Sequence, residues 1–118
     1  MRAKYKVIKN VTFAILKGKI TIGAGDSQLR DVVDKLVKRG RTKIVLDVRG
    51  ITTIDSSGIG ELVGTYTTVL NRGGDIVLLN LPPKLEELFH ATQLITVFDI
   101  AKNADEAIHI LQKRNRGG

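Results

Sequence analysis

The stretch Asp55-Ser56-Ser57-Gly58-Ile59-Gly60 decides how this chain is interpreted. It follows the apolar segment 43–48, which is typical of a buried strand, and precedes residues 61–70, whose apolar side chains recur with the period of a helix. At the start of a helix several backbone N–H groups lack partners, and the helix dipole is positive there. The stretch therefore predicts a strand-to-helix turn that suits an anion, either a bound phosphate or a phosphoryl group carried on a serine.

Catalysis by one of these serines is not supported. A serine nucleophile needs a base within reach, and the hydrolase elbow has glycines two positions before and after the serine. That spacing fails at both Ser56 and Ser57. The two histidines, His90 and His109, lie in predicted amphipathic helices, where we expect them on the surface or partly packed. We therefore expect no enzymatic activity.

The glycines of the stretch are weak evidence for a nucleotide-binding loop. The chain has no P-loop and no Gly-x-Gly-x-x-Gly fingerprint. Close packing of the helix on the sheet around Gly60 and Gly64 explains these glycines at least as well. Helix capping is the structural alternative for Asp55, Ser56 and Ser57, since all three residue types are preferred N-caps. A helix start needs one cap, so a spare hydroxyl remains as a candidate phosphate acceptor.

Composition excludes several other classes of function. The chain has 118 residues, which predicts a single domain spanning 1–118, with residues 113–118 as a frayed basic tail. With no cysteine and only two isolated histidines, we expect no disulfide, metal site or cofactor. No apolar run approaches the roughly 20 residues of a membrane span, and no signal peptide is recognisable. The sequence thus predicts a cytoplasmic protein that does not bind membranes.

The net charge of +7 does not indicate nucleic-acid binding. Seven of the 19 basic residues lie near the two ends of the chain, and the remaining 12 balance the 12 acidic residues. No nucleic-acid motif accompanies the charge, and only five aromatic residues are available for stacking. We expect no specific nucleic-acid partner, and attribute the charge to solubility or weak steering towards an acidic partner.

The N-terminal half begins with a hairpin of two short strands, residues 5–9 and 11–16, that ends where Lys17-Gly18-Lys19 breaks the pattern. Residues 20–25 form an apolar loop, with Ile20 and Ile22 expected beneath the domain. A helix capped by Asp26 or Ser27 follows and stops at Gly40. Its apolar stripe consists of Leu29, Val32, Val33, Leu36 and Val37. A buried strand at 44–48 then leads to a turn at Arg49-Gly50.

In the helix after the central stretch, the residues expected to be largely buried are Ile59, Leu62, Val63, Tyr66, Val69 and Leu70, whereas Glu61, Thr65 and Thr68 are expected to be more exposed. A strand at 75–80, a helix from Pro83, a strand at 96–100 and a helix at 104–113 complete the chain. Strands alternating with helices predict an α/β fold. We expect a mixed, mostly parallel sheet with an N-terminal antiparallel hairpin and about four helices.

The central stretch resembles the Asp-Ser-Ser-Gly-(Leu/Ile)-Gly signature of STAS domains, the family of bacterial anti-sigma-factor antagonists. The resemblance covers nearly the whole chain and includes the strand at 44–48, the break at 71–74 and residues 94–98. It implies that the unphosphorylated protein binds an anti-sigma factor that is also a serine kinase, which frees the sigma factor for transcription. Phosphorylation of the serine after the aspartate, here Ser56, ends the association, and a PP2C-type phosphatase reverses it.

Carried over by this resemblance, Ser56 is the phosphate acceptor, Asp55 orients the turn and Ser57 is the neighbouring cap. The partner-binding residues implied are Asp55, Ser56, Ser57, Gly58, Ile59 and Gly60, with Ile22 and Gly23. None is catalytic, because ATP and metal belong to the kinase, and the free protein is expected to be a monomer. Many members carry an acidic pair where this chain has Gly18-Lys19-Ile20-Thr21, a partner-facing difference. The alternative is a STAS domain serving a stress-sensing complex, a transporter or a signalling enzyme.

Overall fold

The computed structural model of the chain describes residues 1–113. The elements follow in the order β1 (Arg2–Ile8), β2 (Val11–Ile20), α1 (Asp26–Lys38), β3 (Lys43–Ile54), α2 (Ser56–Asn71), β4 (Asp75–Leu79), α3 (Pro83–Ala91), the 3-10 helix η1 (Leu94–Thr96), β5 (Asp99–Ala101) and α4 (Ala104–Lys113). The predicted tail residues 114–118 lie outside the described range, and Lys113 is the last residue of α4.

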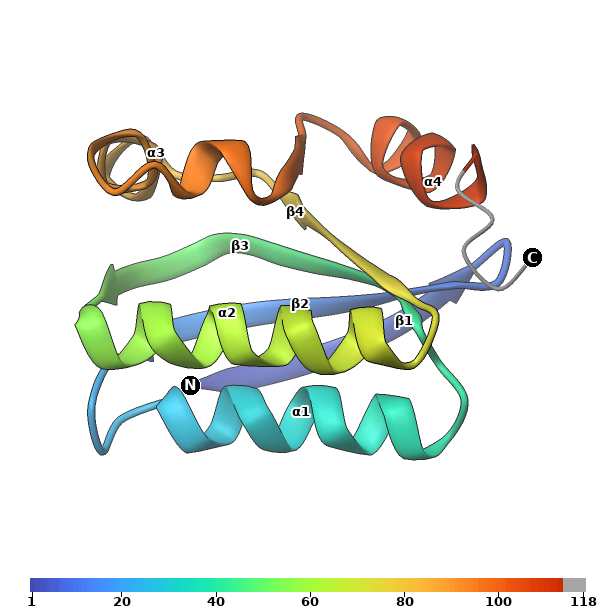
Figure 1. Cartoon of the computed structure of the whole chain (residues 1–118), viewed down its shortest axis with the longest axis horizontal. Coiled ribbons are helices and arrows are strands. Elements are labelled where there is room, and N and C mark those ends of the chain that lie inside the picture. Colours follow the sequence, from blue (N-terminus) through green and yellow to red (C-terminus); the bar gives the residue numbers. More distant parts are fainter. Residues whose placement is uncertain (114–118) are drawn as a thin grey trace.

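The strands form one sheet in the order β1-β2-β3-β4-β5. β1 pairs antiparallel with β2, and the other neighbouring pairs are parallel. Figure 1 shows α1 and α2 side by side along one face of the sheet, with α4 on the other side. The predicted fold class is therefore confirmed: a mixed, mostly parallel sheet with an antiparallel N-terminal hairpin and, in the described range, four α-helices.

The central strands are buried on both faces, as is usual for parallel strands between helices. Alternate side chains point into two apolar clusters. The cluster under α1 and α2 takes Ala14, Leu16, Ile44, Leu46, Ile76 and Leu78 from the sheet. The cluster under α4 takes Val11, Phe13, Val45, Val77 and Leu79. The turn that joins β3 to α2 lies at the end of the sheet, where Ser56 is exposed.

The N-terminal hairpin is present, but its second strand is longer than predicted. Lys9 and Asn10 both have positive φ, as a two-residue hairpin turn requires. The prediction that Lys17-Gly18-Lys19 ends the second strand is wrong, because β2 continues to Ile20. The strand stays paired with β3 across two register shifts on either side of Lys17 and Gly18. An irregularity of this kind interrupts the alternation of apolar residues in the sequence, although the strand continues through it.

The predicted turn at Arg49-Gly50 is also absent, because β3 runs unbroken from Lys43 to Ile54. A Cβ atom at Gly50 would lie 2.7 Å from the carbonyl oxygen of Leu16 on β2. The glycine therefore allows two strands to approach closely and does not turn the chain. As a result β3 extends beyond β4 and delivers the central stretch at its far end.

Helix α1 confirms its predicted stripe, with all five residues buried. The predicted cap is wrong: the N-cap is Gly25, and neither Asp26 nor Ser27 caps the helix with its side chain. The helix ends as predicted at Gly40, whose φ is +74°. The N–H of Arg41 donates to the carbonyl of Leu36 and that of Gly40 to Val37, the two bonds of a Schellman ending.

Helix α2 is amphipathic, although its buried face is rotated from the prediction. Leu62 and Val69 are buried as expected, whereas Ile59, Val63, Tyr66 and Leu70 are only half-buried. The prediction that Thr65 is more exposed than the apolar stripe is wrong, since this residue is 2% exposed. Its hydroxyl donates to the carbonyl of Leu62 at 2.9 Å, so the polar group is satisfied within the helix. Glu61 and Thr68 are half-buried, more exposed than Leu62 and Val69 but in the same class as Ile59, Val63, Tyr66 and Leu70.

In the C-terminal part, α3 starts at Pro83 and α4 buries Ala107, Ile108 and Leu111, as predicted. The strand predicted at 96–100 is displaced. Residues 94–96 form η1, and the strand β5 occupies 99–101. The ring of Phe98 packs on Tyr66 of α2, with centroids 4.8 Å apart, and anchors this segment on the α2 side.

Candidate partner-binding and phosphorylation site

Asp55 joins the end of β3 to the start of α2 and fixes the turn on both sides. It is the N-cap of α2 in an extended conformation, and its Oδ1 accepts a hydrogen bond from the N–H of Gly58 at 2.9 Å. Its Oδ2 accepts from the N–H of Ile22 at 3.0 Å, across to the loop after β2. One carboxylate therefore binds the loop and the helix start together, which supports its predicted role of orienting the turn.

These hydrogen bonds keep Asp55 ionised. The N–H groups of Ile22 and then Gly58 lower the pKa of its carboxyl, and together they outweigh the opposing effect of burial; the N–H of Ser57 adds a smaller lowering. The turn consequently carries a fixed negative charge at neutral pH.

The two serines of the stretch have different surroundings. Ser57 is half-buried, and its hydroxyl donates to Oδ2 of Asp26 on α1 at 3.3 Å. Ser56 is exposed, and its hydroxyl makes no hydrogen bond to another residue of the described range. Asp55 supplies the cap and Ser57 ties α2 to α1, so Ser56 is the hydroxyl that the fold does not use. Of the three potential capping side chains in the sequence, Asp55 is therefore the one that caps α2.

Close packing of the helix on the sheet occurs at a different glycine from those predicted. A Cβ at Gly58 would lie 1.9 Å from the carbonyl oxygen of Ile20 and 2.8 Å from Cγ1 of Ile54. Gly60 and Gly64, where close packing was expected, are exposed and would have no atom within 4 Å of a Cβ. They leave a smooth outer surface on the first turns of α2 instead. Ile59, which precedes Gly60 in the same helix, is half-buried.

The loop after β2 presents an apolar side chain beside this surface. Ile20 is buried as predicted, but the prediction that Ile22 tucks under the domain is wrong, because it is 76% exposed. Thr21 and Ala24 exchange two backbone hydrogen bonds of 2.9 Å and place Ile22 and Gly23 at the tip of a tight turn. Gly23 has φ +71°, which favours glycine. Within 1–113 Ile22 is the most exposed of the large apolar side chains recorded.

An ion pair beside the turn was not predicted. Nε of Arg30 on α1 donates to Oε1 of Glu61 on α2 at 2.6 Å, and Nη2 donates to Oε2 at 3.3 Å. The hydrogen bond and charge of Glu61 raise the pKa of Arg30 above its ordinary value. Both residues lie off the apolar stripes of their helices. They become partners because α1 packs beside α2, which the sequence alone does not show. The pair supports the Asp26–Ser57 link one turn away.

Within residues 1–113 no histidine is hydrogen-bonded to either serine. His90 on α3 and His109 on α4 are both exposed. Among residues 1–113 no group of three histidine, aspartate or glutamate side chains is placed to hold a metal ion. None of the helices described is long and apolar enough to cross a membrane.

Residues 2–107 match the sequence profile of the STAS domain. The chain belongs to the STAS domain family. Among relatives of this STAS domain is the anti-sigma-B factor antagonist of Bacillus subtilis (strain 168), which is 30% identical over 80 residues that cover 68% of this chain and 72% of the relative. The family implied by the central stretch is therefore confirmed.

Solved structures agree with the fold. The crystal structure of TM1081 from Thermotoga maritima has a TM-score of 0.84 at 22% identity and covers 93% of this chain and 94% of that one. The anti-sigma factor antagonist SpoIIAA, a Bacillus cell fate determinant, matches in its unphosphorylated form with a TM-score of 0.70 at 20% identity, covering 96% of this chain and 100% of that chain. Its phosphorylated form matches with a TM-score of 0.67 at 23% identity and the same coverage. SpoIIAA thus keeps a STAS fold in both forms.

Proposed function

We propose that this STAS domain is an anti-sigma-factor antagonist switched by phosphorylation of Ser56. In its unphosphorylated form it binds an anti-sigma factor that is also a serine kinase, and so releases the sigma factor. Transfer of a phosphoryl group to Ser56 ends the complex, and a PP2C-type phosphatase restores it. The domain itself is no enzyme, works in the cytoplasm and is a monomer when free.

The observation that carries this proposal is the contrast between the two serines. Ser56 is exposed and unused by the fold, whereas Ser57 is engaged with Asp26. A kinase can therefore reach the hydroxyl of Ser56 without breaking a structural hydrogen bond. Phosphate adds about −1.5 to −2 charges at a helix N-terminus, where the dipole favours anions, so the fold should tolerate it.

The partner surface proposed around Ser56 combines small, apolar and acidic groups. Ile22 supplies an exposed apolar side chain, and Gly60 leaves room for a partner backbone to approach. The ionised carboxylate of Asp55 lies next to Ser56 in the chain. The proposed surface also includes Gly23, Ser57, Gly58 and Ile59. These residues contribute through the backbone conformation that they give to it.

Phosphorylation would change the electrostatics of that surface strongly. A phosphate on Ser56 adds its charge beside the carboxylate of Asp55. The carboxylate of Asp26 on α1 accepts a hydrogen bond from the next residue, Ser57. A partner that packs against a neutral hydroxyl would have to desolvate the new charge, at a cost of several kcal/mol. Such a cost removes a micromolar complex, since about 1.4 kcal/mol already weakens binding ten-fold.

Affinity capture with matched baits tests the proposal. The full chain, Ser56→Ala and Ser56→Asp are immobilised and exposed to lysate of the host, and bound proteins are identified by mass spectrometry. We expect an ATP-binding serine kinase on the first two baits and at least ten-fold less on Ser56→Asp. The purified kinase with ATP should then add one phosphate to the wild type, located on Ser56 by peptide sequencing.

Ser57→Ala is the control, because it changes the neighbouring hydroxyl and leaves Ser56 intact. Phosphate found on Ser57, or equal capture by Ser56→Ala and Ser56→Asp, contradicts the switch. The melting temperature of each bait is measured alongside. If Ser56→Asp loses binding because it unfolds, the loss cannot be attributed to the added charge, and the proposal that the switch leaves the fold intact is contradicted.

A further inference from the structure

A second concentration of polar groups lies away from the central turn, where the C-terminal half of α1 meets the edge strand β1. A surface cavity of about 320 Å³ opens there. Its lining combines three cations, Lys35, Arg39 and Arg41, with three apolar side chains, Tyr5, Val7 and Leu36. We call it the α1–β1 cavity.

The lining of the α1–β1 cavity carries net positive charge, although Asp31 and Asp34 lie with Lys35 and Arg39 around the adjoining hollow on α1. No acidic side chain lines it. Within residues 1–113 the recorded salt bridge is Arg30–Glu61, so none of the three cations has a carboxylate partner there. Two of them are arginines, whose planar guanidinium groups match the geometry of phosphate and carboxylate oxygens. The cavity is therefore suited to an anion.

Its apolar wall indicates more than a bare ion. Tyr5 and Val7 are 42% and 49% exposed, so the cavity has an apolar surface that a ligand can reach. Both lie on the α1 side of β1, where the register pairs them with Ala14 and Thr12. Nζ of Lys35 lies 5.7 Å from the centroid of the Tyr5 ring, so charge and aromatic surface adjoin. This combination fits a molecule with an anionic end and an apolar end.

Thr12 provides an independent sign of an incomplete site. This residue lines the same cavity and is 2% exposed, and its hydroxyl is the buried side-chain polar atom without a hydrogen-bond partner in the described range. Buried polar groups are nearly always paired, because an unpaired hydroxyl costs about 1–3 kcal/mol. A ligand oxygen that settles into the cavity would give this hydroxyl a partner.

General features of the fold explain only part of the cavity. Cations near the end of α1 favour the helix dipole, and charged residues beside an edge strand hinder strand-to-strand aggregation. Neither effect requires the exposed Tyr5 and Val7, or leaves the hydroxyl of Thr12 without a partner. The cations come from α1 and the segment that follows it, the exposed apolar side chains Tyr5 and Val7 from β1, and the hydroxyl from β2.

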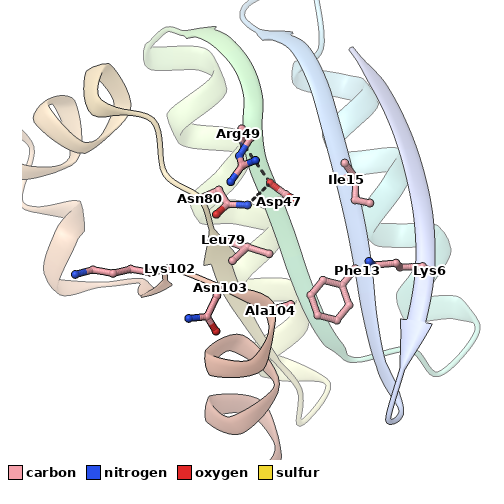
Figure 2. Close-up of a pocket in the computed structure, with 10 residues that line it drawn as sticks. All are labelled: Lys6, Phe13, Ile15, Asp47, Arg49, Leu79, Asn80, Lys102, Asn103 and Ala104. Atoms are coloured by element: carbon pink, nitrogen blue, oxygen red, sulfur yellow. Dashed lines mark hydrogen bonds between the residues drawn. The ribbon is translucent and has the colours of Figure 1, made fainter.

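A cavity of similar size on the α4 side of the sheet serves as the comparison. It encloses about 290 Å³ and is lined by Lys6, Arg49 and Lys102, but Asp47 lies among them. Oδ1 of Asp47 accepts from the backbone N–H of Arg49 at 3.1 Å and from Asn80 at 3.3 Å. Figure 2 shows Asp47 on β3 beside Arg49 and Asn80, and Lys102 directed away from the other cations. Charge is therefore partly compensated there, and the cations do not converge.

We propose that the α1–β1 cavity binds a small organic phosphate. Arg39, Arg41 and Lys35 hold the phosphate, and the apolar part lies on Tyr5 and Val7. The volume is at the lower end of the roughly 300–1,000 Å³ of small-molecule sites, which suits a monoester of modest size. A concave site of this volume does not fit the flat surface of a bilayer, so the expected source is a free metabolite rather than a lipid headgroup.

Phenyl phosphate is the probe, because it joins one phosphate to one flat apolar ring. It is titrated to 10 mM, a concentration in the range of weak fragment binding, into the full ¹⁵N-labelled chain while amide shifts are recorded. We expect saturable shifts centred on Tyr5, Thr12 and Arg41, and weaker binding of inorganic phosphate. Arg39→Gln/Arg41→Gln should bind at least ten-fold more weakly. Arg49→Gln/Lys102→Gln removes the same formal charge from the other cavity and should bind like the wild type.

Three results overturn the proposal. One is the absence of saturable shifts, and another is an equal loss of affinity in the two double variants, which would mean diffuse electrostatic attraction. The third comes from vesicles of phosphatidylcholine with phosphatidic acid: co-sedimentation that is lost in Arg39→Gln/Arg41→Gln would assign the site to a lipid headgroup. Unchanged melting temperatures of both double variants establish that each is folded. Thr12→Val, which has the same shape without the hydroxyl, should weaken phenyl phosphate binding without disturbing the fold.

Discussion

Gly58 is the position where one added methyl group should disturb the central turn most. In Gly58→Ala the new Cβ would lie 1.9 Å from the carbonyl oxygen of Ile20 and 2.8 Å from Cγ1 of Ile54. The first obstacle is backbone, so no side-chain rotation relieves it. The first turn of α2 has to move away from β2. That movement also lengthens the hydrogen bond from the N–H of Asp55 to the same carbonyl, which is already 3.4 Å long.

The expected loss of stability follows from these two contacts. Overpacking costs about 1–3 kcal/mol, and a weakened backbone hydrogen bond adds up to about 1 kcal/mol. Gly58→Ala should therefore lose roughly 2–4 kcal/mol, or on the order of 10 °C in melting temperature for a domain of this length. Gly64→Ala is the matched control, since that glycine is exposed in the same helix with no atom within 4 Å of a Cβ. It should gain about 1 kcal/mol from helix propensity.

Urea unfolding followed by circular dichroism at 222 nm measures both variants under the same conditions. The slope of free energy against urea should not change, because the surface exposed on unfolding is nearly the same. The two substitutions should move the midpoint in opposite directions. If Gly58→Ala is as stable as Gly64→Ala, the close approach of α2 to β2 is absent, and the account of how the turn is positioned is wrong.

Three further substitutions test other parts of the structure. Leu62→Ala removes a buried side chain of α2 and should cost about 2–5 kcal/mol in urea unfolding; a loss below 1 kcal/mol would mean that α2 is packed differently. The folded state lowers the pKa of Asp55 below its ordinary value of 3.8, so its carboxylate stabilises the fold above that pH and ceases to do so as the pH falls through the lowered pKa. The urea midpoint of the wild type should therefore fall more steeply below pH 4 than that of Asp55→Asn, and parallel profiles would contradict the hydrogen bonds assigned to Asp55. Thr12→Val removes a buried hydroxyl without a partner and should raise stability by about 1 kcal/mol in the absence of ligand; a loss of similar size would show that the hydroxyl is bonded in solution.

The parts of the fold that the sequence predicts well are those governed by local periodicity. The stripe of α1, the buried strand β4 and the inward residues of α4 were all expected from spacing alone. Gly40 was expected to end α1, because a left-handed residue there is the usual helix ending. Each of these features depends on residues within a few positions of one another.

The errors arise where a distant segment decides the outcome. Gly50 looks like a turn residue until Leu16 is placed 2.7 Å from its missing Cβ. Gly58 and Gly60 are alike in sequence, yet the carbonyl of Ile20 lies against the first and nothing lies against the second. Ile22 was expected inside because it is apolar, whereas the tight turn from Thr21 to Ala24 turns it outward. Sequence spacing holds no information about these neighbours.

The same long-range contacts explain why the site is suited to a switch that leaves the fold intact. Three links hold the region together: Asp55 to the N–H of Ile22, Ser57 to Asp26, and Arg30 to Glu61. They join the loop after β2, α1 and α2 without using Ser56. A change at Ser56 therefore adds charge to a surface whose backbone is held by other residues. Removing Asp55 or Ser57 should loosen the site, whereas modifying Ser56 should alter only what the site binds, and comparing melting temperature with partner affinity across these three positions separates the two roles.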